Sequence, residues 1–109
     1  MSIDQTDVVD FVSIDPVSGR TFLTISDHLD WDENEGEHLL MLQEKLNAYL
    51  RFIENGEMEE GFPQTRGRHV TIHISAKYPM SKEAKKFFRL AKSAIDEAGF
   101  ALEFELLKE

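Results

Sequence analysis

The sequence predicts an α+β domain: a two-layer sandwich in which two helices cover one face of a four-stranded mixed sheet. The elements follow the order ββαβαβ, without repeats, low-complexity tracts or a linker. The last two strands alternate apolar and polar residues, which indicates that only one face of the sheet meets a core. A chain of 109 residues, 41% of them apolar, suits a single domain over 1–109 with one ordinary core.

A hairpin is predicted over 8–26, after a start of five residues that we expect to fray. Both arms, 8–14 and 20–26, are rich in β-branched and aromatic residues. Between them, Pro16 fixes one backbone angle of a turn and Gly19 accepts a positive one.

The first helix is predicted over about 36–55, because leucines and other apolar residues recur there at helical spacing and Asn55-Gly56 follows as a stop. Polar and acidic residues before it should cap it and favour its positive end. A flanking stripe of Met41, Ala48 and Phe52 predicts burial on two sides or, alternatively, a surface for self-association. Residues 57–67 show no period and are predicted to form a connecting loop.

The clearest strand lies over 69–78, where apolar residues occupy every second position. A second helix over 81–98 should begin at Ser81 as its N-cap and end before a left-handed Gly99. A final strand is predicted over 101–107.

Right-handed crossovers with both helices on one side carry the chain steadily across a sheet. The predicted strand order is therefore 1-2-3-4, with only the first strand antiparallel. An order that places the first strand between the second and third is the alternative.

Charge divides the chain into two unequal halves. The net charge is −9, with fifteen acids and three bases up to residue 60, and six acids and nine bases after it. Nucleic acid and anionic lipid would both repel such a domain at long range, so neither is expected as a partner.

The chain has no cysteine, which removes disulfides, thiolate nucleophiles and Cys-ligated zinc from consideration. It also has no apolar run near the roughly 20 residues of a membrane span and no signal-peptide pattern. We expect a cytoplasmic protein with no membrane association and no cofactor.

The most polar segment, 27–38, resembles a metal loop at first sight. Asp30, Asp32 and Asn34 match the opening of a calcium loop, but Glu35 and Met41 stand where that loop needs Gly and Glu. The calcium interpretation therefore fails at both diagnostic positions.

His28, Asp30 and His38 could instead bind zinc or manganese, and a metal- or small-molecule-binding domain is the alternative function. Acidic residues at a helix start are the more ordinary explanation of the same segment. Trp31, the single tryptophan, should pack back on the domain; if exposed, it would anchor an interface.

No phosphate loop, nucleophile elbow, zinc-protease motif or dinucleotide fingerprint is present, so no catalytic residue and no enzyme activity are predicted. The leading hypothesis is a non-enzymatic, acidic protein–protein interaction domain: an adaptor, accessory subunit or inhibitor-like domain. Five residues are predicted to bind the partner: Asp27, His28, Asp30, Trp31 and Asp32. A homodimer, formed through the flanking stripe or by attraction between the two halves, is a third hypothesis.

His69 and His73 lie on the polar face of their strand, roughly 13 Å apart, too far to share a metal. Each could pair across strands with Glu103 or Glu105. The second helix carries a basic stripe opposite its apolar side, which consists of Lys82, Lys85, Lys86, Arg89 and Lys92. Such a stripe is typical of a solvated helix face. The alternative is that it docks on an acidic surface.

Residues 1–12, 23–31 and 42–57 together resemble a family of small uncharacterised bacterial proteins, with similarity over nearly the whole chain. The most specific part is Ser26-Asp27-His28-Leu29-Asp30-Trp31, a Ser-Asp-His-Leu-x-Trp motif. The resemblance implies a stand-alone domain and a bacterial cytosolic source. It implies no site residues, because that family has no assigned activity.

Overall fold

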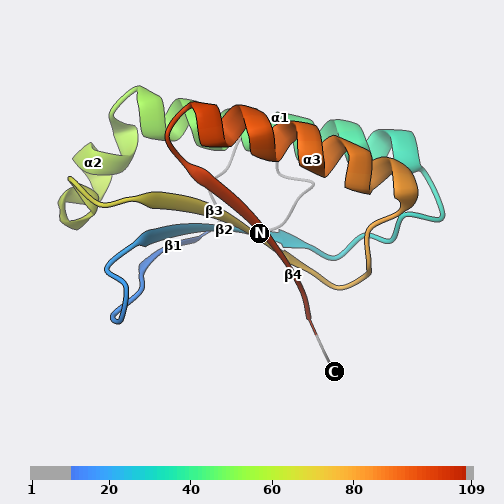
Figure 1. The fold of residues 1–109 in the computed structure, drawn as a ribbon, viewed down its shortest axis with the longest axis horizontal. Coiled ribbons are helices and arrows are strands. Elements are labelled where there is room, and N and C mark those ends of the chain that lie inside the picture. The colour runs from blue at the N-terminus through green and yellow to red at the C-terminus, as the bar shows by residue number, and fades with distance from the viewer. Residues whose placement is uncertain (1–10, 108–109) are drawn as a thin grey trace.

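A four-stranded mixed sheet carries two long helices on one of its sides in the computed structural model, which describes residues 11–107 (Figure 1). The elements are β1 (Phe11–Ile14), β2 (Thr21–Asp27), α1 (Glu35–Glu54), α2 (Glu57–Gly61), the 3-10 helix η1 (Pro63–Thr65), β3 (Val70–Ala76), α3 (Lys82–Glu97) and β4 (Ala101–Leu106). The frayed start and the beginning of the first strand were predicted over residues that lie outside this range.

The strand order is β1-β2-β3-β4, with β1 antiparallel to β2 and the other two pairs parallel. This confirms the predicted order and directions, and the alternative order is wrong. Ile25 pairs with Ile74, and Ile74 with Phe104, so the alternation of the three parallel strands stays in phase across the sheet.

The core lies between the sheet and the two long helices. Alternate residues of β2, β3 and β4 turn their side chains into it, among them Leu23, Ile25, Ile72, Ile74 and Leu102, all buried. From the helices, Leu46 and Ile95 complete this layer. Tyr49 ties α1 to the sheet, because its hydroxyl donates a hydrogen bond to the carbonyl of Thr24 at 2.8 Å.

The ends of α3 follow the sequence prediction. The Ser81 hydroxyl accepts a hydrogen bond from the amide of Ala84 at 3.1 Å, and Gly99 has a φ of +94°. The start of α1 differs, because Asn34 is left-handed and makes no side-chain capping bond. No helix within residues 11–107 combines the length and the apolar character needed to cross a membrane.

The predicted loop over 57–67 is wrong in part, since it contains both α2 and η1. Met58 is buried and belongs to the core cluster, so one apolar side chain anchors the short helix α2. Thr65 is also buried, and its hydroxyl donates to the carbonyl of Phe62 at 2.7 Å. A segment held by one anchor and local hydrogen bonds shows no hydrophobic period.

The flanking stripe of α1 is largely used inside the domain. Ala48 is buried, and Met41 and Phe52 are partly buried and pack against the core cluster. Burial of α1 on two sides is thus what the structure shows, and little of the stripe is left for self-association.

Candidate functional site

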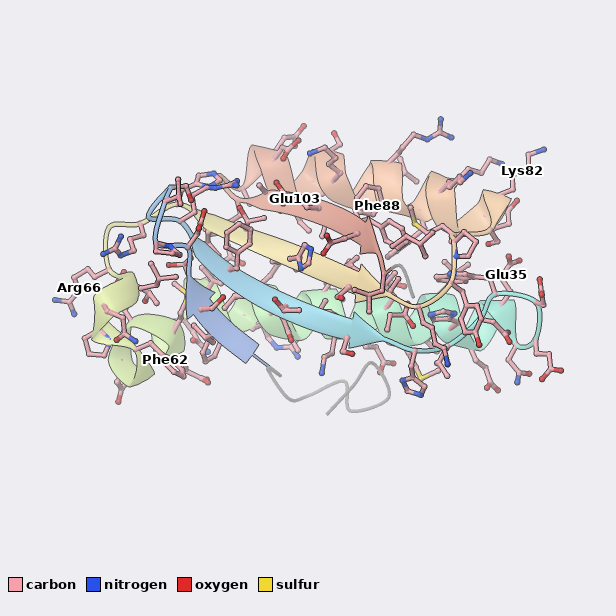
Figure 2. The ribbon with its side chains drawn as sticks, turned by 90° about the horizontal axis from the view of Figure 1, so that it is seen from below. Glu35, Phe62, Arg66, Lys82, Phe88 and Glu103 are labelled. Carbon is pink, nitrogen blue, oxygen red and sulfur yellow. The ribbon has the colours of Figure 1, made fainter. Side chains whose placement is uncertain are left out.

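The carboxyl ends of β2 and β3 and the start of α1 meet at one end of the molecule (Figure 1). Ligands of sheets with parallel strands commonly bind outside the carboxyl ends of those strands. Figure 2 places Glu35 and Lys82 at this end, and Phe62 and Arg66 at the opposite end. The acidic segment singled out from the sequence, 27–38, therefore lies at the carboxyl ends of the parallel strands β2 and β3.

Asp27, the last residue of β2, meets His38 of α1 in the interior. Their side chains are 2% and 1% exposed. The Nε2 atom of His38 lies 2.7 and 2.8 Å from the two carboxylate oxygens of Asp27, and its Nδ1 atom lies 2.9 Å from the carbonyl oxygen of Asp30.

The hydrogen bonds satisfy both buried side chains of this pair. A carbonyl oxygen can only accept, so Nδ1 of His38 donates to Asp30. One proton lies between the Nε2 atom of His38 and the carboxylate of Asp27 and forms the hydrogen bond that joins them. Asp27 gains a further donor in the amide of Leu29, at 3.1 Å. Each buried polar group thus has the partners that burial requires.

Trp31 covers the imidazole ring. The two rings stack with centroids 3.4 Å apart and planes 13° apart, and Trp31 is 6% exposed. This confirms that Trp31 packs on the domain, and it rules out the exposed anchor considered as the alternative. Asp27, Trp31 and His38 are called the buried cluster below.

The buried cluster bears on the metal hypothesis. Both ring nitrogens of His38 are already engaged within the protein. Across residues 11–107, no three His, Asp or Glu side chains converge as a metal site would need. The geometry therefore gives the set His28, Asp30 and His38 no support as a zinc or manganese site.

The remaining predicted binding residues, His28, Asp30 and Asp32, are exposed on the β2–α1 loop. Beside them lies a pocket of about 280 Å³, lined by His28, Leu29, Asp30, Glu33, Asn34, Glu37, His38, Met41 and Tyr78. We call it the acidic pocket. Its other lining residues, Leu29, Glu33, Asn34, Glu37 and Tyr78, were not predicted as site residues. The available signal for Glu33 and Glu37 was the density of acidic residues in the segment 27–38.

The acids of this pocket are not neutralised nearby. No ion pair within the described part of the chain involves Asp30, Glu33 or Glu37. The nearby Lys77 instead places its ammonium over the ring of Tyr78, 5.6 Å from the centroid. The acidic pocket thus presents three carboxylates that can pair with a cation from outside.

The opposite face of the sheet is occupied by contacts among its own side chains. His73 lies 3.2 Å from the carboxylate of Glu105, which confirms the predicted cross-strand pair. Arg20 lies 3.6 Å from Glu103 and donates to the hydroxyl of Thr71 at 3.3 Å. His69 precedes β3 and is exposed. These contacts are surface electrostatics of small energetic weight.

The chain belongs to a family of unknown function, DUF6572, whose model matches residues 1–108. This confirms the resemblance to an uncharacterised family. No curated protein and no solved structure matches the chain.

Proposed function

We propose that this member of a family of unknown function is a non-enzymatic protein-interaction domain, an adaptor or accessory protein, that binds a cationic segment of a partner protein at the acidic pocket. The observation that carries the proposal is a pocket walled by three unpaired carboxylates and built on a buried cluster. Asp30, Glu33 and Glu37 supply the charge.

The size and lining of the pocket favour a side chain over a whole small molecule. Small-molecule sites usually measure about 300 to 1,000 Å³, and this pocket is at the lower limit, about 280 Å³. Leu29, Met41 and Tyr78 offer apolar surface to the methylene groups of lysine or arginine. The carboxylates would accept charge-assisted hydrogen bonds from the cationic end.

The buried cluster keeps the pocket in place. His38 holds the backbone of Asp30 through its carbonyl, and Asp27 holds the amide of Leu29. Two pocket residues are therefore attached to the end of β2 and to α1. A wall that is ordered before binding loses little conformational entropy when the partner arrives.

Long-range charge supports the same kind of partner. The acidic excess of residues 1–60 would accelerate encounter with a basic surface and select against acidic ones. A chain without cysteine also suits the cytoplasm, the compartment we propose.

The test reverses the charge of the pocket without touching the buried cluster. A triple variant, Asp30→Lys, Glu33→Lys and Glu37→Lys, is compared with a matched triple of exposed acids elsewhere, Glu44→Lys, Glu54→Lys and Glu60→Lys. Each is used, with the unaltered chain, for quantitative affinity capture from cells that carry the gene, after circular dichroism has shown that all fold. The proposal predicts a partner lost only with the pocket triple. Equal recovery with all three proteins would contradict it.

A further inference from the structure

Four basic side chains of α3 surround a cavity with an apolar floor. Lys82, Lys85, Lys86 and Arg89 follow the helical spacing i, i+3, i+4 and i+7, so they lie along one stripe. The cavity between them measures about 430 Å³, and its other lining residues are Met80 and Phe88. This distinguishes the stripe from the uniformly polar, solvated face that the sequence indicated.

Most of these cations lack a counter-charge. Within residues 11–107, Lys82, Lys85 and Arg89 form no ion pair, and Lys86 lies 4.0 Å from Glu83 with both side chains exposed. An exposed pair at that distance contributes little. The cavity therefore carries a local positive charge on a chain whose net charge is −9.

The cavity continues along an open sheet edge. Among residues 11–107, β4 pairs with β3 only, so every second N–H and C=O group along its other side has no strand partner in this part of the chain. A second hollow of about 640 Å³ shares Met80 and Phe88 with the first and follows β4; the rest of its lining is His73, Lys92, Leu102, Glu103, Phe104 and Glu105. Figure 2 shows Phe88 and Glu103 beside β4. We call the two cavities together the basic groove.

We propose that the basic groove binds an extended acidic segment of a partner protein, which adds to the sheet as a fifth strand beside β4. The open edge would supply main-chain hydrogen bonds, and alternate side chains of the segment would supply specificity. Acidic side chains on the helix side would meet Lys85 and Arg89. An apolar side chain between them would contact Phe88, whose ring rests edge-to-face on Phe104 with centroids 6.2 Å apart.

A second copy of the chain fits this edge poorly. Antiparallel pairing of two β4 strands would set Glu103 and Glu105 against the same residues of the other copy, and like charges directly opposite are destabilising. Glu103 and Glu105 lie on the face of the sheet away from the helices, where they would also repel acidic side chains of a bound segment. Segment residues on that face should therefore be neutral or basic. The expected segment therefore alternates acidic or aromatic residues with neutral or basic ones.

The test begins with a phage-displayed library of random linear peptides, selected on the full chain and then synthesised with a fluorescent label. We expect selected peptides to be enriched in Asp, Glu and an aromatic residue. By fluorescence polarisation, Lys85→Glu with Arg89→Glu should weaken their binding about tenfold or more, through loss of charge-assisted contacts. The matched double variant Arg51→Glu with Arg66→Glu, which changes exposed arginines elsewhere, should bind as the unaltered chain does.

A second readout tests the added strand. Hydrogen exchange followed by NMR should show new protection at alternate amides of β4 when peptide is bound, and N-methylation of alternate peptide amides should abolish binding. No acidic enrichment, equal binding by the Lys85/Arg89 variant, or unprotected β4 amides would each overturn the proposal. The proposal would also be overturned if a labelled single-stranded RNA displaced the peptides and lost its binding in the Lys85/Arg89 variant. Peptide binding should persist in the acidic-pocket triple variant, because the acidic pocket and the basic groove have no lining residue in common.

Discussion

Asp27 and His38 stand eleven positions apart and meet because β2 ends where α1 begins. Burial of each side chain depends on the other. Alone, either polar side chain would be costly to bury; together, with the amide of Leu29 and the carbonyl of Asp30, the two side chains are hydrogen-bonded. Trp31 then excludes water from one face of the imidazole.

This pair yields the first prediction. Asp27→Ala should lower the free energy of unfolding by about 3–5 kcal/mol, because it breaks a buried hydrogen-bonded pair and leaves Nε2 of His38 and the amide of Leu29 without their partner. Urea denaturation followed by tryptophan fluorescence measures it. Asp32→Ala, on the exposed part of the same loop, should stay within about 0.5 kcal/mol. A loss below about 1 kcal/mol in the Asp27 variant would show that the pair does not fix the loop.

The turn before β2 yields a prediction about pH. A hydrogen bond from the Ser18 hydroxyl, at 2.7 Å, and one from the amide of Val17 lower the pKa of Asp15 below its ordinary value of 3.8. Because the folded pKa is depressed, the stabilisation is present above the unfolded value and is lost as pH falls through the folded one. NMR titration should find the Asp15 midpoint below 3.8, and Ser18→Ala should move it upward. An unchanged midpoint would assign the shift to another cause.

Burial of Asp27 and His38 was not predicted from the sequence. Asp27 follows Leu23 and Ile25 at alternate positions of a strand, and His38 precedes Leu42 by one helical turn, so both lie on core-facing positions. The pattern was nevertheless interpreted as an acidic helix start. Burial of a charge depends on a partner from another element, and local periodicity carries no information about that partner.

At the scale of elements, the sheet was predictable because two independent rules agreed. Alternation in β3 and β4 fixed which face meets the core, and right-handed crossovers then left one steady strand order. The segment α2 was missed because a helix of five residues, anchored by Met58, is too short to show a period. The left-handed conformation of Asn34 before α1 was not predicted, because a single residue outside the helix leaves no trace in the hydrophobic period.

The start of α3 allows a measurement of one capping bond. Ser81→Ala should cost about 1 kcal/mol, because the amide of Ala84 loses its acceptor at the helix N-terminus. Thermal or urea unfolding gives the difference. Ser93→Ala, at an exposed position within the same helix, serves as the control and should be nearly neutral or slightly stabilising. Equal effects of the two substitutions would contradict a capping role for Ser81.

At the scale of the whole molecule, two surfaces of opposite charge start from the same end. Figure 2 places Glu35, in the first turn of α1, and Lys82, in the first turn of α3, at this end. The sequence singled out the acidic segment 27–38 but did not show which of its residues form the buried cluster and which line the acidic pocket. The basic groove was also hidden, since its apolar floor joins Met80 and Phe88 to a strand edge that only the fold reveals.

The same arrangement predicts indifference to divalent metals. His38 uses both ring nitrogens within the protein, and the carboxylates of the acidic pocket do not converge as the ligands of a metal site would within residues 11–107. Zinc, manganese and calcium should therefore leave the melting temperature of untagged protein unchanged. Differential scanning calorimetry across metal concentrations measures this. A melting temperature that rises with metal concentration would show that the metal binds the folded state, and it would support the metal-binding hypothesis.

The most direct test of the proposed function is a cross-link formed from inside the acidic pocket. A photoreactive phenylalanine analogue replaces Glu33 in the full chain, expressed in cells that carry the gene, and mass spectrometry identifies the cross-linked segment of the partner. If the acidic pocket binds the partner, one protein should be cross-linked through a segment that contains lysine or arginine, and the cross-link should be lost when Asp30→Lys and Glu37→Lys are added. Cross-links that survive those two substitutions, or segments without a basic residue, would contradict it.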